Sequence, residues 1–570
     1  MEISETPFFR ELSERKVFHA LAVYAGSGWL CIEILLLMEH KYSWSPLLVE
    51  PLMMIIFCGL PAVLVYTWFH SKLSSKQNRK IEIPLYAVNV LIAGYLVIHA
   101  VSTSQRDVTK KPVEREITSS SIAVLPFATI GSVSESRDFA EGVAISIRSH
   151  LGKIGNLKVI SGNSVEYFRD TTVFMPVISE MVGAKYVLEG SVQGQRDIIR
   201  IVVTLYDGMA EEQVWTETYD KEYKDLLTVQ SEIAWEVANE LNITINPGVR
   251  ERITKKTTSS LEAYKWYLKG QQVMFSGKTT EDIQDSAIHF FEKAIALSPD
   301  FASAYTGLAR AWQEKVNWGN AASKEVIPKV LEHVKEAAKI DHESGDVYLM
   351  LSMVGFYQLD FQEAEKNVLR AIELDPNNTE PYYWLANIYC MTRGFDEGLK
   401  VIEKLDELNP LAYDKNKANR ASLYYYSGSY DEVLKLAEGA PKGFIQWIKA
   451  CTLVELGRYE EAINTFSTFT KSNWMLGYAY GKAGRTEEAR AILERLLEER
   501  KREYVPPYMI AVNYLGLGEI DEAFKWLELG LEEGPVYTYI MAMRSGNILG
   551  VIEDDNRFIA LLEKFGFERI

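Results

Sequence analysis

The sequence predicts a multidomain chain: a three-helix transmembrane anchor, a small α/β domain, and an all-α superhelix of repeated helix pairs. Three observations favour this order. Long apolar runs fall within residues 1–103, and short β-branched runs alternate with amphipathic stretches over residues 119–245. Small and aromatic residues then recur at a period near 34 over residues 260–548.

Composition and charge exclude several classes of function. The chain has 570 residues, a net charge of -17 and four cysteines. Residues 1–105 are balanced in charge, so the acidic excess belongs to the rest, which would repel phosphate backbones; we expect no nucleic-acid partner. Cys31, Cys58, Cys390 and Cys451 lie far apart without a CxxC pair or nearby histidines. They predict buried apolar thiols, with no disulfide framework, metal or cofactor.

Three apolar segments, residues 17–38, 52–69 and 84–101, are each long enough to cross a hydrocarbon core of about 30 Å as a helix. Membrane lipid is therefore an expected partner. Basic residues cluster before the first segment and at 72–80. By the positive-inside rule they place the N-terminus in the cytoplasm and the residues after about 102 in the periplasm, across a bacterial inner membrane.

Glu33 is the one carboxylate well inside an expected span. Charged groups at that depth are costly, so a proton or ion relay is one interpretation. The alternatives are that Glu33 lies near the outer end of the span, is protonated, or bonds within the helix bundle.

A polar linker, residues 104–118, leads to a segment with alternating elements. The patterns predict strands over 121–127, 157–160, 186–192, 198–206 and 214–219, and helices over 139–154, 176–182 and 226–241. This order predicts a mixed sheet with helices packed on it.

The same segment carries SIAVLPF from Ser121, DFAEG from Asp138, LKVIS from Leu157, YVLEGSV from Tyr186 and VWTETYD from Val214. As an ordered set these resemble the TolB amino-terminal-like (FlgO-like) domain of bacterial envelope proteins, over residues 119–245. The sequence departs from that pattern at Gly162 and Asn163 and at 208–211. The resemblance implies a fold and an envelope setting, with no catalytic residues.

Residues 260–548 resemble tetratricopeptide repeats in about eight units. Ala364, Ala371 and Pro376 occupy second-helix positions, and later units repeat a turn followed by a small residue, as at Gly457 and Ala462. The second unit has an insertion at 317–323, interpreted as drift or as a contact loop. Residues 549–570 resemble the terminal capping helix of such arrays. The presumed concave lining, from the first helices of the units, comprises Tyr305, Trp312, Tyr382, Asn387, Tyr389 and Tyr480.

No phosphate-binding glycine loop, nucleophile elbow or HExxH motif occurs in the sequence. The leading hypothesis is a non-enzymatic, inner-membrane-anchored scaffold whose outward repeats bind a protein or peptide; homo-oligomers are left open.

The alternative is a sensory component that passes an envelope signal to a cytoplasmic partner, because the domain order resembles a bacterial group whose members often carry a class III nucleotide cyclase or a winged-helix domain. A third hypothesis is an enzyme with an unfamiliar active site between domains.

Overall fold

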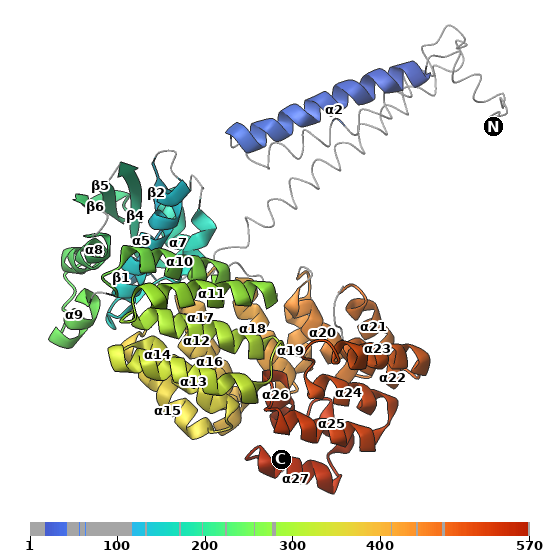
Figure 1. Cartoon of the computed structure of the whole chain (residues 1–570). Helices are drawn as coiled ribbons and strands as arrows, with labels where there is room; N and C mark the ends of the chain where they lie inside the picture. The colour runs from blue at the N-terminus through green and yellow to red at the C-terminus, as the bar shows by residue number, and fades with distance from the viewer. Residues whose placement is uncertain are drawn as a thin grey trace, which may run out of the picture. The chain divides into compact units, whose positions relative to one another are not determined.

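The computed structural model describes residues 17–42, Ile56, Val63 and residues 117–567, with gaps in the last range at 131–133, 170–172, 196–197, 223–224, 256, 276–280, 412, 441–442 and 470–473. The chain divides into two compact units, Met1–Glu114 and Arg115–Ile570 (Figure 1). Each unit is described by itself.

The described part of the first unit is mainly helix α2, Val17–Tyr42. Across the residues that the structure describes, none of the helices joins the length and the apolar character needed for a membrane crossing. The apolar run of α2 is interrupted by Glu33 and ends in Glu39, His40 and Lys41. The prediction of a three-helix transmembrane anchor is therefore wrong for α2. The expected localisation, in a bacterial inner membrane with a periplasmic body, is contradicted as well.

The other expected spans, 52–69 and 84–101, lie outside the described residues apart from Ile56 and Val63. Glu33 is exposed on α2 and accepts a hydrogen bond from the Trp29 indole nitrogen one turn earlier, at 2.9 Å. This is an ordinary i,i+4 contact on one helix face, and it gives Glu33 a local partner.

The second unit begins with an α/β domain whose strands and helices alternate as the hydropathy patterns predicted. Its elements are β1 Thr118–Val124, β2 Ala128–Thr129, α5 Ser134–Gly152, β3 Lys158–Val159, α6 Gly162–Val165, η1 Glu166–Phe168, α7 Met175–Val182, β4 Ala184–Gln195, β5 Ile198–Asp207, β6 Glu212–Glu222, α8 Leu226–Glu240 and α9 Pro247–Thr254. The short elements β2, α6, η1 and α9 had no counterpart in the sequence prediction.

Within the described residues these strands form a six-stranded mixed sheet in the order β3-β1-β4-β5-β6, with β2 paired to β4. The pairs β1–β3, β1–β4 and β2–β4 are parallel, and β4–β5 and β5–β6 are antiparallel. One face is covered by α5 and α8, with Ile147 and Val237 fully buried. The other face is covered by α6 and α7 through Val165 and Ile178, where Leu411 of the helical array joins the same cluster.

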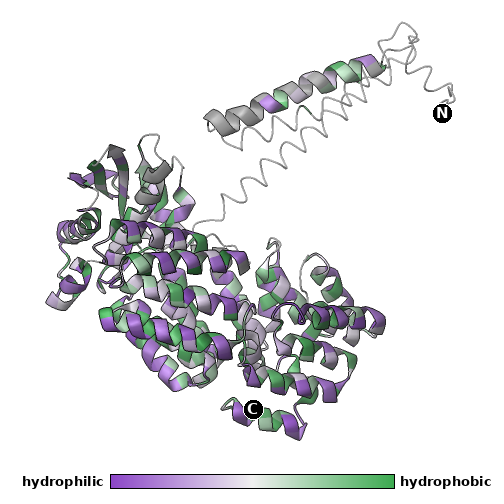
Figure 2. Ribbon diagram, viewed as in Figure 1, coloured by the Kyte–Doolittle hydropathy of each residue, from purple (hydrophilic) through white to green (hydrophobic). Residues whose placement is uncertain are grey.

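The array that follows contains eight described pairs of antiparallel helices. The pairs are α10 Leu261–Phe275 with α11 Glu281–Leu297, α12 Ala302–Asn317 with α13 Ser323–Ile340, α14 Gly345–Tyr357 with α15 Phe361–Leu374, α16 Thr379–Thr392 with α17 Phe395–Leu408, α18 Tyr413–Tyr426 with α19 Tyr430–Ala437, α20 Phe444–Glu455 with α21 Tyr459–Phe466, α22 Trp474–Lys482 with α23 Thr486–Glu499, and α24 Pro507–Leu517 with α25 Ile520–Glu532. Then come α26 Tyr537–Ser545, η3 Leu549–Ile552 and α27 Asn556–Lys564. Figure 2 shows hydrophilic and hydrophobic residues on different sides of these helices.

The turns between consecutive helix pairs place polar side chains against the α/β domain, and these side chains recur at the spacing of the repeat. Asp341, Asp375 and Asn409 lie 34 residues apart, at the end of three successive second helices. Lys255 donates to Asp341 Oδ1 at 2.7 Å, and Asn409 Oδ1 accepts from the hydroxyls of Ser161 and Ser164. The regular spacing of the repeat therefore becomes a regular row of contacts with the neighbouring domain.

Asn377, two residues after Asp375, makes several hydrogen bonds to the α/β domain. Its Nδ2 donates to the carbonyls of Gly152 and Leu157, both at 2.9 Å, and its Oδ1 accepts from the Val159 N–H at 2.9 Å. One side-chain amide thus gives hydrogen-bond partners to backbone groups of the turn between α5 and β3, one of them at the edge of the sheet. These groups lie more than 200 residues from Asn377 in the sequence.

Asp375 lies beside this contact with one carboxylate oxygen buried and unpaired. Desolvation, followed by the charge of Asp346, raises the pKa of Asp375 from 3.8 to about 7, and the charge of Lys153 lowers it in part. Lys153 is itself desolvated, which lowers its pKa. The interface between the domain and the array therefore contains a carboxyl that titrates near neutral pH.

Replacing Asn377 by Ala should lower the free energy of unfolding by about 2–3 kcal/mol, because several backbone groups lose their partner at once. Urea unfolding measures the change, and hydrogen exchange should rise at residues 152–159. Asn156→Ala is the matched control, since Asn156 is exposed and makes one 3.4 Å bond. Equal effects of the two substitutions would contradict the role assigned to Asn377.

Asp375→Asn should change the pH dependence of stability. Because the folded pKa of Asp375 is raised, its contribution to stability is full below about pH 4 and is lost as pH rises through about 7. The variant should therefore gain about 1–2 kcal/mol over the wild type at pH 8 and lose that advantage at pH 5. Urea unfolding of both chains at each pH gives the difference, and the exposed Asp431→Asn should show none.

Candidate functional site

The inner side of the array is covered by the chain's own end, which we call the C-terminal segment, Val536–Phe567. It contains α26, η3 and α27 and contacts helices that precede it by more than 90 residues. In Figure 1, α26 lies between the helices of the first and second halves of the array. The repeat array therefore holds a helix of its own chain, α26, against the first helices of its pairs.

Four hydrogen bonds join the C-terminal segment to α16, α18 and α20. The Tyr537 hydroxyl donates to Asn387 Oδ1 at 2.7 Å, and Arg544 Nε donates to the Cys390 carbonyl at 3.1 Å. Asn547 Nδ2 donates to the carbonyl of Tyr425 at 2.7 Å, and the N–H of Ile548 donates to Glu455 Oε1 at 2.9 Å. These four donors of the segment therefore meet acceptors on first helices.

Aromatic rings add to these bonds at both ends of the segment. Tyr537 stacks on Phe356 with ring centroids 6.1 Å apart, and Phe567 stacks on Phe361 at 5.6 Å. Tyr539 is fully buried against Tyr508, at 4.9 Å. Stacked and edge-on aromatic pairs each contribute about 0.5–1.5 kcal/mol beyond the area they bury.

The insertion at 317–323 reaches the turn that precedes the C-terminal segment. The N–H of Lys324 donates to the Glu533 carbonyl at 3.0 Å. A Cβ on Gly534 would collide with Ser323 Oγ, and Gly534 also has φ +89°, so only glycine fits there. Of the two interpretations of the insertion, the contact loop is the one the structure supports, and its contact is within the chain.

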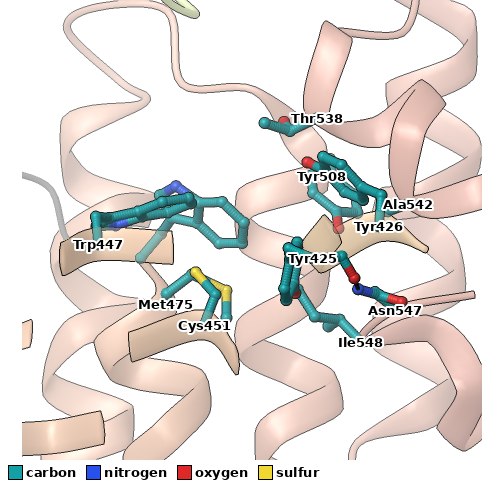
Figure 3. A pocket seen from close by; sticks show the side chains of 11 residues that line it. Tyr425, Tyr426, Trp447, Cys451, Met475, Tyr508, Thr538, Ala542, Asn547 and Ile548 are labelled. Carbon is teal, nitrogen blue, oxygen red and sulfur yellow. Dashed lines mark hydrogen bonds between the residues drawn. The ribbon is translucent and has the colours of Figure 1, made fainter. Parts of the chain in front are cut away.

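A small cavity remains between α26 and the first helices α18, α20, α22 and α24 (Figure 3). Its volume is about 10 Å³, which is room for about one water molecule. The cavity is lined by Tyr425, Tyr426, Trp447, Cys451, Trp474, Met475, Tyr508, Thr538, Ala542, Asn547 and Ile548. With the C-terminal segment in place, the site has no room for a substrate.

Burial shifts the pKa values of the ionisable groups near this cavity toward their neutral forms. Desolvation, and then the charge of Glu455, raise the pKa of the Cys451 thiol well above its usual value. Burial likewise raises the pKa of the Glu455 carboxyl, while the bonds from Ile548 and Tyr425 oppose that shift. A nucleophilic thiol requires the opposite environment, one that lowers its pKa. Among the described residues no group of three or more His, Cys, Asp or Glu could hold a metal ion.

The six residues proposed from the sequence as a concave lining have different partners in the structure. Asn387 is 1% exposed and is the member that contacts the C-terminal segment. The others are half-buried and have local partners: Tyr382 donates to the Pro376 carbonyl, Lys329 lies over Trp312, Arg393 over Tyr389 and Arg485 over Tyr480, while Tyr305 packs on the core.

Sequence reasoning missed Glu455, Tyr425 and Cys390 as parts of the inner side. A usable signal was present in the first helices, which carry isolated polar residues among apolar ones. Buried examples on first helices are Gln313, Ser352, Asn387, Ser422, Thr452 and Asn513. Of these, Asn387 accepts a bond from the C-terminal segment, whereas Thr452 bonds within its own helix and Asn513 to the neighbouring first helix.

Comparison with known families identifies the repeats. Models of the tetratricopeptide repeat match residues 368–400 and 471–500, so the chain contains such repeats, as the sequence predicted. The chain is also similar to a protein of Rhizobium meliloti (strain 1021) named "Putative adenylate cyclase 3", with 28% identity over 246 residues. That match spans 43% of this chain and 42% of the length of the relative.

Among solved structures, similar chains include YrrB, described as a TPR protein with an unusual peptide-binding site, at 20% identity and a TM-score of 0.22, covering 32% of this chain and 89% of that one. A thermophilic TPR protein of Thermus thermophilus has 16% identity and a TM-score of 0.23, covering 41% and 99%. A human IFIT1 dimer with PPP-AAAA has 13% identity and a TM-score of 0.36, covering 53% and 77%.

The buried thiols provide a test of this closed arrangement. At pH 8, iodoacetamide should modify the exposed Cys31 and react about a hundredfold more slowly with Cys390 and Cys451, whose thiolates are suppressed and shielded. Burial raises the pKa of Cys390 to about 12. Mass spectrometry of timed samples gives each rate, and unfolding in urea should equalise them. Comparable rates in the folded chain would contradict the closed inner side.

Proposed function

We propose that the chain is a non-enzymatic scaffold whose repeat array binds a protein or peptide partner. The observation that carries the proposal is that the first helices already hold a helix: Asn387, the Cys390 carbonyl, the Tyr425 carbonyl and Glu455 accept bonds from the C-terminal segment. Stacked helix pairs form extended binding surfaces of this kind because each pair adds a similar face to its neighbour.

The α/β domain contributes a fixed position for that surface. We propose that it is a TolB amino-terminal-like domain, which is supported by the ordered motifs from Ser121 to Asp220 and by strand pairing that places SIAVLPF beside YVLEGSV. The bonds of Asn377 and Asn409 join it to the repeat turns. The domain and the array would then present their partner surfaces as one body.

A second candidate function is regulation of a nucleotide cyclase. It is favoured by the similarity to the Rhizobium meliloti protein named as an adenylate cyclase, although that match covers less than half of either chain. In this case the chain supplies a binding body, and the cyclase that it acts on is the partner of the array.

Affinity capture with the full chain tests both candidates. Partners recovered from extracts of cells that encode the chain should fall about tenfold with the double variant Asn387→Ala and Glu455→Ala, which removes two side-chain acceptors that hold the C-terminal segment. The matched control is Glu363→Ala with Lys366→Ala, an exposed pair on the second helix α15. A partner set that the first variant leaves unchanged contradicts the proposed surface, and recovery of an adenylate cyclase would select the second candidate.

A further inference from the structure

The way in which the C-terminal segment is bound differs from the way in which consecutive repeats pack. Four of its hydrogen bonds run to residues 93–154 positions earlier in the chain, in addition to the bond from the Tyr539 hydroxyl to the Leu527 carbonyl of the preceding pair. Two of its anchors, Tyr537 and Arg544, lie seven residues apart, which places them two turns apart on one face of α26. The segment is therefore attached to the inner side much as a separate helix would be.

Several contacts of the segment are polar, beside the apolar side chains such as Ile540 and Leu549 that it buries. Asn387 and Asn547 are buried polar groups, and Glu455 is a desolvated carboxyl that is bonded to neutral donors. Buried polar groups stabilise little on balance, because each bond must first offset the loss of water. Helix α26 has nine residues, too few for a stable helix on its own.

The connection after α26 is strained. Ile548 has φ +67° and ψ -39°, a conformation that a β-branched residue rarely adopts. A residue in this conformation persists only while its surroundings impose it. Here its N–H is held by Glu455, and release of the segment would relieve the strain.

We propose that the C-terminal segment is an internal occupant of the helix-binding surface, and that a partner binds by replacing it. The proposal rests on the proposed function. The partner that fits is a short amphipathic helix with a tyrosine and, seven residues later, an arginine, because these side chains reach Asn387 Oδ1 and the Cys390 carbonyl. The aromatic ring of that tyrosine would stack on Phe356 as Tyr537 does.

The test uses the full chain and a fluorescein-labelled peptide with the sequence of residues 535–552. Tyr537→Phe with Arg544→Ala removes two bonds, one from a charged donor, but keeps the ring that stacks on Phe356. The population with an open inner side should rise about ten- to a hundredfold. Fluorescence anisotropy should show at least tenfold tighter binding of the peptide to this variant than to the wild type, and iodoacetamide should modify Cys390 and Cys451 correspondingly faster.

Two controls keep the test specific. Tyr459→Phe with Arg458→Ala makes the same chemical changes at the start of the second helix α21, away from the segment, and should behave as the wild type. A peptide that carries Phe and Ala in place of its Tyr and Arg should bind at least tenfold more weakly. Circular dichroism establishes that each variant is folded, and Tyr537→Phe alone serves as a milder variant.

The outcomes separate this proposal from the proposed function. Unchanged cysteine labelling together with no peptide binding overturns the proposal. Dimers of the variant, seen by light scattering, would assign the surface to a second copy and also overturn it. If captured partners leave Cys390 and Cys451 protected, the function stands and the replacement is wrong. If the variant binds its peptide and no partner depends on the inner side, the segment is exchangeable but the proposed function fails, and replacement by a partner fails with it.

Discussion

Each helix pair of the array can bury its apolar face only against the pair beside it, and this constraint determines the rest of the second unit. An array built in this way exposes an apolar face at each end, and both ends must be covered. At the first end, Tyr264 and Leu268 of α10 pack on α5 of the α/β domain, where the Tyr264 hydroxyl donates to the Gly142 carbonyl. At the last end, α27 buries Phe558 and Leu561. The α/β domain is thus a structural cap as well as a second domain.

The same constraint explains why the inner side carries polar groups. First helices contact neighbours on two sides, so a residue on their remaining side faces the axis of the superhelix. A polar group there must bond to a partner or to water, because an unpaired buried group costs about 1–3 kcal/mol. Asn387, the Cys390 carbonyl and Glu455 find those partners in the C-terminal segment. Burial raises the pKa of the thiols and hydroxyls of this region and keeps them neutral.

The sequence was sufficient for local structure and insufficient for long-range contacts. Hydropathy periods predicted the strands around Ile122, Val187 and Val203, because alternation and burial are recorded in the residues themselves. The two-residue strand β3 exists only through its pairing with β1, and α26 crosses to α16 through side chains 150 residues away. The expected anchor is contradicted for α2, because none of the described helices combines the length and the apolar character of a membrane crossing.

Helix α16 connects the two sets of contacts on which the unit depends. Asn377, just before its first turn, holds the turn between α5 and β3, and Asn387 and Cys390, near its last turn, hold the C-terminal segment. An α-helix of fourteen residues transmits a displacement along its axis with little loss, because its backbone bonds are closed within it. Helix α16 is therefore the element that both sets of contacts share, over about 15 Å at about 1.5 Å per residue.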